Sequence, residues 1–260
     1  MRGIPEAVCK LLRLENLALD NNSIELLKPD CFANLTQLRS LTMNNNRLTE
    51  IPNHIFDSNK LLQLVNFNVN NINSIGLYVF SNASILKNLE SISNRIEYLP
   101  GRAYLINVTI LDVSNNLISR LDPLALTLLQ EASEIRLHNN HITSTVNDIL
   151  ANNSNLKSLT VTGSAMRGIP EAVCKLLRLE NLALDNNSIE LLKPDCFANL
   201  TQLRSLTMNN NRLTEIPNHI FDSNKLLQLV NFNENNINSI GLYVFSNASI
   251  LKNLESISFR

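Results

Sequence analysis

Histidines and cysteines are the residues whose types could hold a metal or carry out redox chemistry here. His138 and His141 flank one turn and could form a metal pair, but no third ligand is evident beside them, so solvated turn histidines are the alternative. No C-x-x-C motif is present, which argues against zinc and thioredoxin-type sites. Nor is there a Gly-rich phosphate loop, a nucleophile elbow or an H-E-x-x-H motif. The sequence therefore predicts a protein that is not an enzyme and uses no cofactor or metal.

The composition narrows the classes of partner. Lys plus Arg number 22 and Asp plus Glu number 23, so the net charge is -1. This balance argues against nucleic acid or an anionic membrane surface as the main partner. The apolar runs are far shorter than the ~20 residues that span a bilayer. Because 47 Leu and 42 Asn make up about a third of the 260 residues, the composition indicates a repeat built on these two types.

One template, L-x-x-L-x-L-x-x-N-x-L, recurs along nearly the whole chain, most often every 24 residues. Its first copy consists of Leu14, Leu17, Leu19, Asn22 and Ile24. Later copies begin at Leu38, Leu62, Val108, Ala132, Leu156, Leu179, Leu203 and Leu227. The copy at Leu156 is weaker, with Ser164 in place of Asn. A second signal follows the strands, as in Ile51-Pro52 before Phe56.

The template has a simple physical meaning. Its alternating apolar core predicts a short strand with one face directed inward. An Asn at the bend can donate and accept hydrogen bonds, so stacked Asn residues can form a buried ladder between coils. Because one coil cannot bury its own apolar edge, coils must stack. The predicted fold is an α/β solenoid, a curved horseshoe of about eleven coils with a parallel concave sheet, spanning 1–260 as one domain.

The repeat resembles the leucine-rich repeat pattern over the whole chain. The 24-residue period with L/I-P-x-x-x-F is similar to the "typical" extracellular subclass. The stretch Ser164-Ala165-Met166-Arg167-Gly168-Ile169-Pro170 looks more specifically like insect Toll receptor ectodomains and secreted insect immune repeat proteins. The resemblance implies an extracellular recognition module, secreted or part of a receptor, that binds a protein or other macromolecule.

Residues 1–93 recur as 166–258, with one difference in 93 positions, Val69 against Glu234. Exposed positions of solenoid repeats normally diverge, so a recent duplication and an engineered or artificial concatenation both remain open.

The first duplicated segment continues as Ser91-Ile92-Ser93-Asn94. If the template is aligned with its first two apolar positions on Leu89 and Ile92, three residues are missing between this strand and the next Asn. We therefore expect either a distorted coil or missing residues there. In the second duplicated segment, the same alignment predicts a last, truncated repeat that begins with Leu254, Ile257 and Phe259.

The cysteines form two equivalent sets, Cys9 with Cys174 and Cys31 with Cys196. Cys9 aligns with the core residue Phe56, which favours a small, buried apolar side chain. A bridge between adjacent coils is the alternative. The cysteines do not cluster near an end as those of a terminal cap do, and no cap is visible.

Eight N-x-S/T sequons could carry glycans on a secretory route. The candidates in return segments or at strand entries are Asn34, Asn82, Asn107, Asn152, Asn199 and Asn247. Asn21 lies beside the ladder, where a glycan is less expected.

The residues between the inward positions of each strand should form the concave surface. The candidate ligand-binding residues there are Asn66, Asn68, Asp112, Ser114, Glu134, Arg136, His138, Lys157 and Thr160. Aromatic anchors are missing from this surface, so binding would use polar contacts, an edge or the convex side. We expect a receptor-type module of innate immunity or adhesion with no nucleic-acid or membrane contact. Self-association is left open, and an engineered or structural scaffold without a native ligand is the alternative.

Overall fold

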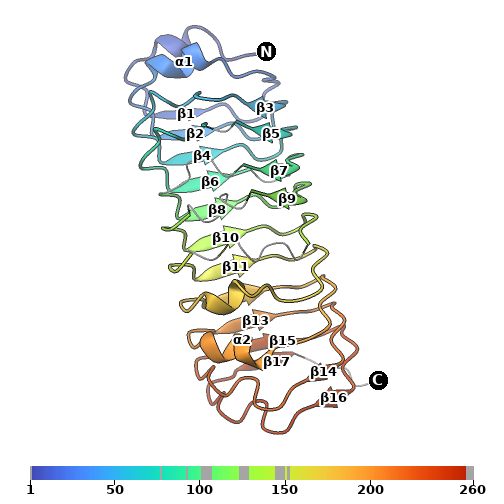
Figure 1. Cartoon of the computed structure of the whole chain (residues 1–260). Helices are drawn as coiled ribbons and strands as arrows, with labels where there is room; N and C mark the ends of the chain where they lie inside the picture. The colour runs from blue at the N-terminus through green and yellow to red at the C-terminus, as the bar shows by residue number, and fades with distance from the viewer. Residues whose placement is uncertain are drawn as a thin grey trace. The chain divides into compact units, whose positions relative to one another are not determined.

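The computed structural model describes residues 2–76, 78–91, 93–100, 107–122, 129–143, 150 and 153–255. The chain divides into two compact units, Met1–Ala132 and Ser133–Arg260. Each unit is a stack of coils in which every coil contributes one short strand to a parallel sheet (Figure 1). The predicted solenoid class is thus confirmed within each unit, and one domain over 1–260 stays a prediction.

The first unit contains the parallel strands β1 (Asn16–Ala18), β2 (Ser40–Thr42), β4 (Leu64–Asn66), β6 (Asn88–Glu90) and β8 (Ile110–Asp112). Their central residues are in register, since Leu17 pairs with Leu41, Leu41 with Val65, Val65 with Leu89 and Leu89 with Leu111. The apolar residue at the centre of each strand therefore stacks on its counterpart in the next coil, which is why the period of the template sets the register.

The second unit contains β10 (Glu134–Arg136), β11 (Ser158–Thr160), β12 (Asn181–Ala183), β13 (Ser205–Thr207), β15 (Leu229–Asn231) and β17 (Asn253–Glu255). They are again parallel and in register, from Ile135 paired with Leu159 to Val230 paired with Leu254. Among the described residues, five coils of the first unit and six of the second contribute such a strand, in agreement with the predicted number of about eleven coils.

The return segments carry short strands and single helical turns. Short parallel pairs form between β3 (Glu50–Ile51) and β5 (Ser74–Ile75), between β7 (Tyr98–Leu99) and β9 (Arg120–Leu121), and between β14 (Glu215–Ile216) and β16 (Ser239–Ile240). Among the described residues, the helices are α1 (Pro29–Asn34) and α2 (Pro194–Asn199), and the 3-10 turns are η1 (Val8–Lys10) and η3 (Val173–Lys175). Proline opens each α-helix, where its missing N–H costs nothing.

The core lies between the sheet and the return segments. All the strand-centre residues predicted to be buried are buried: Leu17, Leu41, Val65, Leu111, Ile135, Leu159, Leu182, Leu206 and Val230. Phe32 and Phe56 meet edge to face at 5.4 Å, and Phe56 stacks on Phe80 at 5.6 Å. These aromatic contacts link successive coils, so the return segments are packed by the same stacking as the sheet.

The asparagine ladder is present as predicted over most of its length. Asn70 donates to Met43 O of the preceding coil and to Phe67 O of its own, and its Oδ1 accepts from Leu48 N. The Asn70 amide thus joins two coils. The buried members are Asn46, Asn70, Asn94, Asn116, Asn140, Asn187 and Asn211.

Two ladder residues are less buried than predicted. Asn22 is exposed, and its amide donates to Leu19 O and Asp20 O of its own coil. Asn235 makes the usual bonds but is half-buried, and the coil after it is described only as far as Glu255. Burial of a ladder residue depends on a coil stacked on either side.

The expected irregularity at Ser91–Asn94 does not occur. Leu89, rather than Ile92, is the strand-centre residue, and it pairs with Val65 and Leu111. Ser91 takes an inward position with 0% exposure, and Asn94 joins the ladder through Phe67 O and Ile72 N. The predicted register was wrong because a serine fills an inward position that Leu, Met, Phe or Val fills in the other coils. No residues are missing from this coil, and β17 likewise centres on Leu254, while Ile257 and Phe259 lie outside the described residues.

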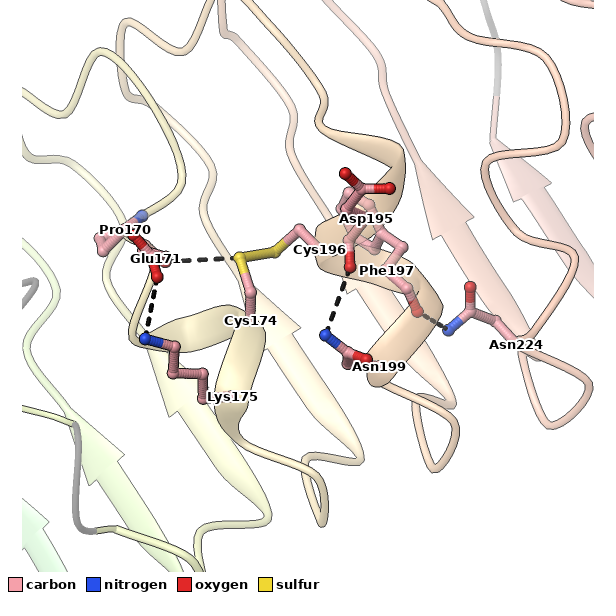
Figure 2. The surroundings of a disulfide bond; sticks show 9 residues. All are labelled: Pro170, Glu171, Cys174, Lys175, Asp195, Cys196, Phe197, Asn199 and Asn224. Carbon is pink, nitrogen blue, oxygen red and sulfur yellow. Dashed lines mark hydrogen bonds and ion pairs between the residues drawn. A yellow bond between two sulfur atoms is a disulfide. The ribbon is translucent and has the colours of Figure 1, made fainter.

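The cysteines are bridged, which corrects the expectation of small, buried apolar side chains. Cys9 bonds to Cys31 and Cys174 to Cys196, each across 22 residues of sequence. Figure 2 shows that the second bridge ties the η3 turn to α2, in the return segments of two successive coils. The sequence alignment of Cys9 with Phe56 could not reveal this, because the sulfur partner lies one coil away.

Candidate functional site

The outward positions of the sheet strands form the candidate recognition surface. In most strands their burial alternates with that of the strand centres, so the side chains on either side of the buried centre are open to solvent or partly so; Asp112 and Asn231 are the buried exceptions. In the first unit, the described charged residues open to solvent at these outward positions are Asp20 and Glu90, both acidic, whereas Asp112 is buried. The described concave surface of this unit is therefore acidic and rich in amides.

Asp20 organises the first part of this surface. Its Oδ2 accepts from Thr42 Oγ1 at 2.7 Å, and its Oδ1 accepts from Asn44 N at 2.6 Å. Asn44 in turn accepts from Asn68 N at 3.0 Å. The bonds run from coil to coil, so the polar side chains are held in place before any ligand arrives.

Glu90 organises the next part. Its Oε2 accepts from Asn66 Nδ2 at 2.7 Å and from Asn68 Nδ2 at 3.2 Å. Asn66 Oδ1 also accepts from Asn68 N at 3.0 Å. The predicted pair Asn66 and Asn68 is thus brought together on the carboxylate of Glu90, which was not among the predicted binding residues. The template places Glu90 at an outward position when Leu89 is taken as the strand centre. The incorrect register predicted around Leu89 is the reason that Glu90 was not selected.

The second copy repeats this arrangement in the second unit. Asp185 accepts from Thr207 Oγ1 at 2.6 Å and from Asn209 N at 2.7 Å, and Asn231 donates to Glu255. Outside the duplicated segment, Arg136 donates to Glu134 Oε1 through Nε and Nη2, both at 2.8 Å. His138 lies two residues after the end of β10 and is half-buried, while Thr160 occupies an outward position of β11.

Three predicted residues do not belong to the open concave surface. Asp112 is 2% exposed and Ser114 is 0% exposed, and Asp112 Oδ1 accepts from Ser114 N at 3.1 Å. Lys157 lies one residue before β11. Because Leu159 is the inward residue of this strand, its outward positions are Ser158 and Thr160, and Lys157 is not one of them. Its ammonium instead lies 3.3 Å from Glu180 at the edge where the chain enters the sheet.

A second set of asparagines, in the return segments, was not predicted. Asn59 is fully buried and donates to Phe32 O at 3.0 Å and to Leu35 O at 2.8 Å. Asn224 makes the same bonds to Phe197 O and Leu200 O, as Figure 2 shows in part. The signal is an Asn three residues before the first Leu of the next template, as in Asn59 and Leu62.

The described sequons selected as glycan candidates lie outside the strands of the sheet. Asn34, Asn82, Asn199 and Asn247 are exposed, and Asn107 is half-buried and donates to Ser84 O. Asn152 lies outside the described residues. Glycans on the exposed positions would leave the concave strands uncovered, because each of these asparagines lies outside the strands of the sheet.

The described residues contain no group of three or more His, Cys, Asp or Glu side chains arranged to hold a metal ion. Within the same residues, no helix has the length and hydropathy needed to cross a bilayer.

Comparisons with known proteins agree with this architecture. The family model described as "BspA type Leucine rich repeat region (6 copies)" matches residues 3–116 and 69–169, and the one described as "Leucine rich repeat" matches residues 154–213. No curated protein matches the chain in sequence.

Several solved structures share the fold. A leucine-rich repeat protein of Leptospira interrogans has a TM-score of 0.85 at 22% identity, over 97% of this chain and 63% of that chain. The TLR13–ssRNA13 complex gives a TM-score of 0.78 at 22% identity, over 90% and 36%. The Toll–Spatzle complex of Drosophila gives 0.70 at 24% identity, over 88% and 34%. This chain thus spans less than two thirds of each of these three. The stacked coils, the asparagine ladder and the family models together establish that the chain belongs to the leucine-rich repeat family.

Proposed function

We propose that this protein is an extracellular recognition module that binds a protein ligand through its concave surface, in a receptor of innate-immune or adhesion type. The observation that carries the proposal is the hydrogen-bonded array around Asp20 and Glu90. Preorganised polar groups bind with less loss of side-chain entropy than mobile ones. A partner with basic and hydrogen-bonding groups would complement this array.

The acidic character of the array favours protein over nucleic acid as the ligand. Carboxylates on the first unit's strands would repel a phosphate backbone, whereas nucleic-acid surfaces of proteins are rich in Lys and Arg. The solved complexes include one neighbour with ssRNA and one with the protein Spatzle. These ligands are those of the neighbouring proteins, so both ligand classes enter the test.

The two disulfide bridges support an extracellular location. Such bridges persist in oxidising compartments and are rare in the cytosol. Under this proposal, Asn34, Asn82, Asn199 and Asn247 carry N-linked glycans, with Asn107 and Asn152 as further candidates. Peptide mapping before and after enzymatic deglycosylation of protein secreted by animal cells would identify the occupied positions.

The test of ligand class presents the secreted protein to an arrayed library of secreted and cell-surface ectodomains and, separately, to single-stranded RNA. We expect an ectodomain to bind, with an affinity that falls as salt rises. Glu90→Lys should weaken that binding by about tenfold or more, because it reverses a charge and releases Asn66 and Asn68. Lys60→Glu, on an exposed return segment, is the control and should leave binding unchanged.

Two outcomes would contradict the proposal. Binding of RNA in preference to every ectodomain would show that the ligand is a nucleic acid and not a protein. Loss of ectodomain binding in Lys60→Glu but not in Glu90→Lys would place the contact on the wrong face. If no ectodomain binds, the alternative of a structural or engineered scaffold without a native ligand is favoured.

A further inference from the structure

At the edge where the chain enters the strands of the second unit lies a hollow with a volume of about 470 Å³. Its lining residues are Lys157, Leu177, Arg178, Glu180 and Gln202. They come from three successive coils, around the entries to β11, β12 and β13. The hollow is separate from the outward positions of the sheet strands, and its Leu177 lies two residues after the disulfide-linked η3 turn.

Two cations in this hollow are held in place by neighbouring coils. Arg178 Nη1 donates to Asn155 Oδ1 at 2.8 Å, and Lys157 Nζ lies 3.3 Å from Glu180 Oε1. Glu180 is shared, since its Oε2 lies 3.3 Å from Arg204 Nε. Among the described residues, no carboxylate lies within ion-pair distance of Arg178. Arg178 thus presents a positive charge that a neutral amide orients but does not neutralise.

An apolar side chain lies beside these cations. Leu177 is 60% exposed, and it lines the same hollow as Arg178. The hollow therefore combines one uncompensated guanidinium, a second cation, a glutamine amide and an exposed leucine. This combination suits a single carboxylate next to an apolar side chain better than a dense polyanion, because the Glu180 carboxylate would repel closely spaced phosphates or sulfates.

We propose that this hollow is a second recognition site, which binds an acidic segment of a protein partner in which a carboxylate side chain adjoins an apolar one. Arg178 pairs with the carboxylate, Lys157 and Gln202 contribute further hydrogen bonds, and Leu177 packs on the apolar neighbour. The site deepens the proposed function, on which it rests: the partner would contact the acidic concave surface with basic groups and this edge with an acidic segment.

The duplication supplies a matched control. Arg13 and Leu12 are the counterparts of Arg178 and Leu177, and both are exposed. Lys157 and Asn155, however, lie outside the duplicated segments 1–93 and 166–258. The full set of groups therefore surrounds Arg178 and not Arg13, although the local sequence is the same.

The probe is a short capped peptide, Gly-Glu-Leu-Glu-Gly, labelled with fluorescein and titrated with the full chain. The Gly-Gln-Leu-Gln-Gly peptide is its neutral control. We expect the acidic peptide alone to bind, and Arg178→Ala and Lys157→Ala each to weaken binding by about tenfold. Arg13→Ala should leave it unchanged. Arg178→Gln, which can still bond to Asn155, tests the charge if the alanine variant unfolds at a lower denaturant concentration.

The inference is overturned if the acidic peptide does not bind, if Arg13→Ala weakens binding as much as Arg178→Ala, or if the glutamine peptide binds equally well. Tighter, Arg178-dependent binding of single-stranded RNA or a heparin oligosaccharide would also overturn it, in favour of a polyanion site. Glu90→Lys should leave the peptide affinity unchanged. A negative result for peptide binding at this edge therefore does not contradict ectodomain binding at the concave surface, and a negative result for ectodomain binding does not contradict peptide binding.

Discussion

Val69 and Glu234, the one pair of residues in which the duplicated segments differ, share a left-handed backbone conformation with φ of 54° and 55°. The same position before the ladder residue is left-handed at Asn21, Asn45, Ser93, Asn115, Asn139, Gly163, Asn186 and Asn210. Asn and Gly tolerate this conformation, whereas a β-branched residue is strained there. The bend of each coil requires it, so the strain is imposed by the repeat.

Replacing Val69 by Asn should therefore stabilise the protein, by about 1 kcal/mol, through relief of backbone strain. Val69→Glu should change the free energy of unfolding less, by under ~0.5 kcal/mol. Urea unfolding of the three proteins measures both differences. A lower stability for Val69→Asn would show that packing of Val69, which is 52% exposed, outweighs its strain.

Val69→Glu also tests whether this exposed valine joins an interface between copies of the chain. An apolar side chain at a coil edge favours association, and a carboxylate opposes it through its desolvation. We expect the parent to associate more readily than the variant when light scattering is followed across protein concentration. Identical profiles would leave the substitution without a role in association.

Removing one ladder amide should be costly. Asn116 donates to Ser91 O, Val113 O and Ser114 O and accepts from Ile96 N, and it is buried. Asn116→Ala should destabilise the protein by about 1–3 kcal/mol, because buried backbone groups lose their partners. The exposed Asn22 is the matched control, and Asn22→Ala should cost less. Equal losses in denaturant unfolding would argue against a role for burial.

Each disulfide should stabilise its unit by limiting the unfolded chain. Closing a loop of 22 residues is expected to contribute about 3 kcal/mol. The double replacement of Cys174 and Cys196 by Ser should lower the free energy of unfolding by this amount, measured without reductant. The same replacement of Cys9 and Cys31 provides the comparison in the other copy. Unchanged stability in both would contradict the expected contribution.

Tyr98 should make stability depend on pH in the alkaline range. Its hydroxyl donates to Asp122 Oδ2 at 2.7 Å, and this bond to a carboxylate raises the pKa of Tyr98 above its ordinary value. The neutral phenol is therefore favoured in the folded state. The resulting stability is present below the pKa of the unfolded chain and is lost as pH rises through the folded pKa.

Tyr98→Phe should accordingly destabilise the protein near neutral pH, by less than ~1 kcal/mol because the pair is exposed. The difference from the parent should shrink as pH rises through the pKa of Tyr98. Urea unfolding at a series of pH values measures it. Asp122→Asn is the control, since it should return the pKa of Tyr98 toward its ordinary value. A difference that does not change with pH would refute the assignment.

By itself, the sequence determined the class of fold, the strand centres and most of the ladder. The template records which side chains must be inward, and residues such as Leu111 and Asn70 follow from the period because every coil has the same inward positions. The period also indicated an outward polar surface that includes Asn66 and Asn68. It failed at Leu89 because Ser91 breaks the apolar alternation, and this hid Glu90.

Only the tertiary structure decided which residues meet across coils. Disulfide pairing between Cys174 and Cys196, the bonds of Asp20 to Thr42 and Asn44, and the burial of Asp112 all depend on distances between stacked coils, which a linear pattern does not contain. The convergence of Lys157 and Arg178 at one edge has the same origin. Stacking places residues about one period apart in contact, and the side chains at each contact then determine whether they pair, pack or leave a charge for a partner.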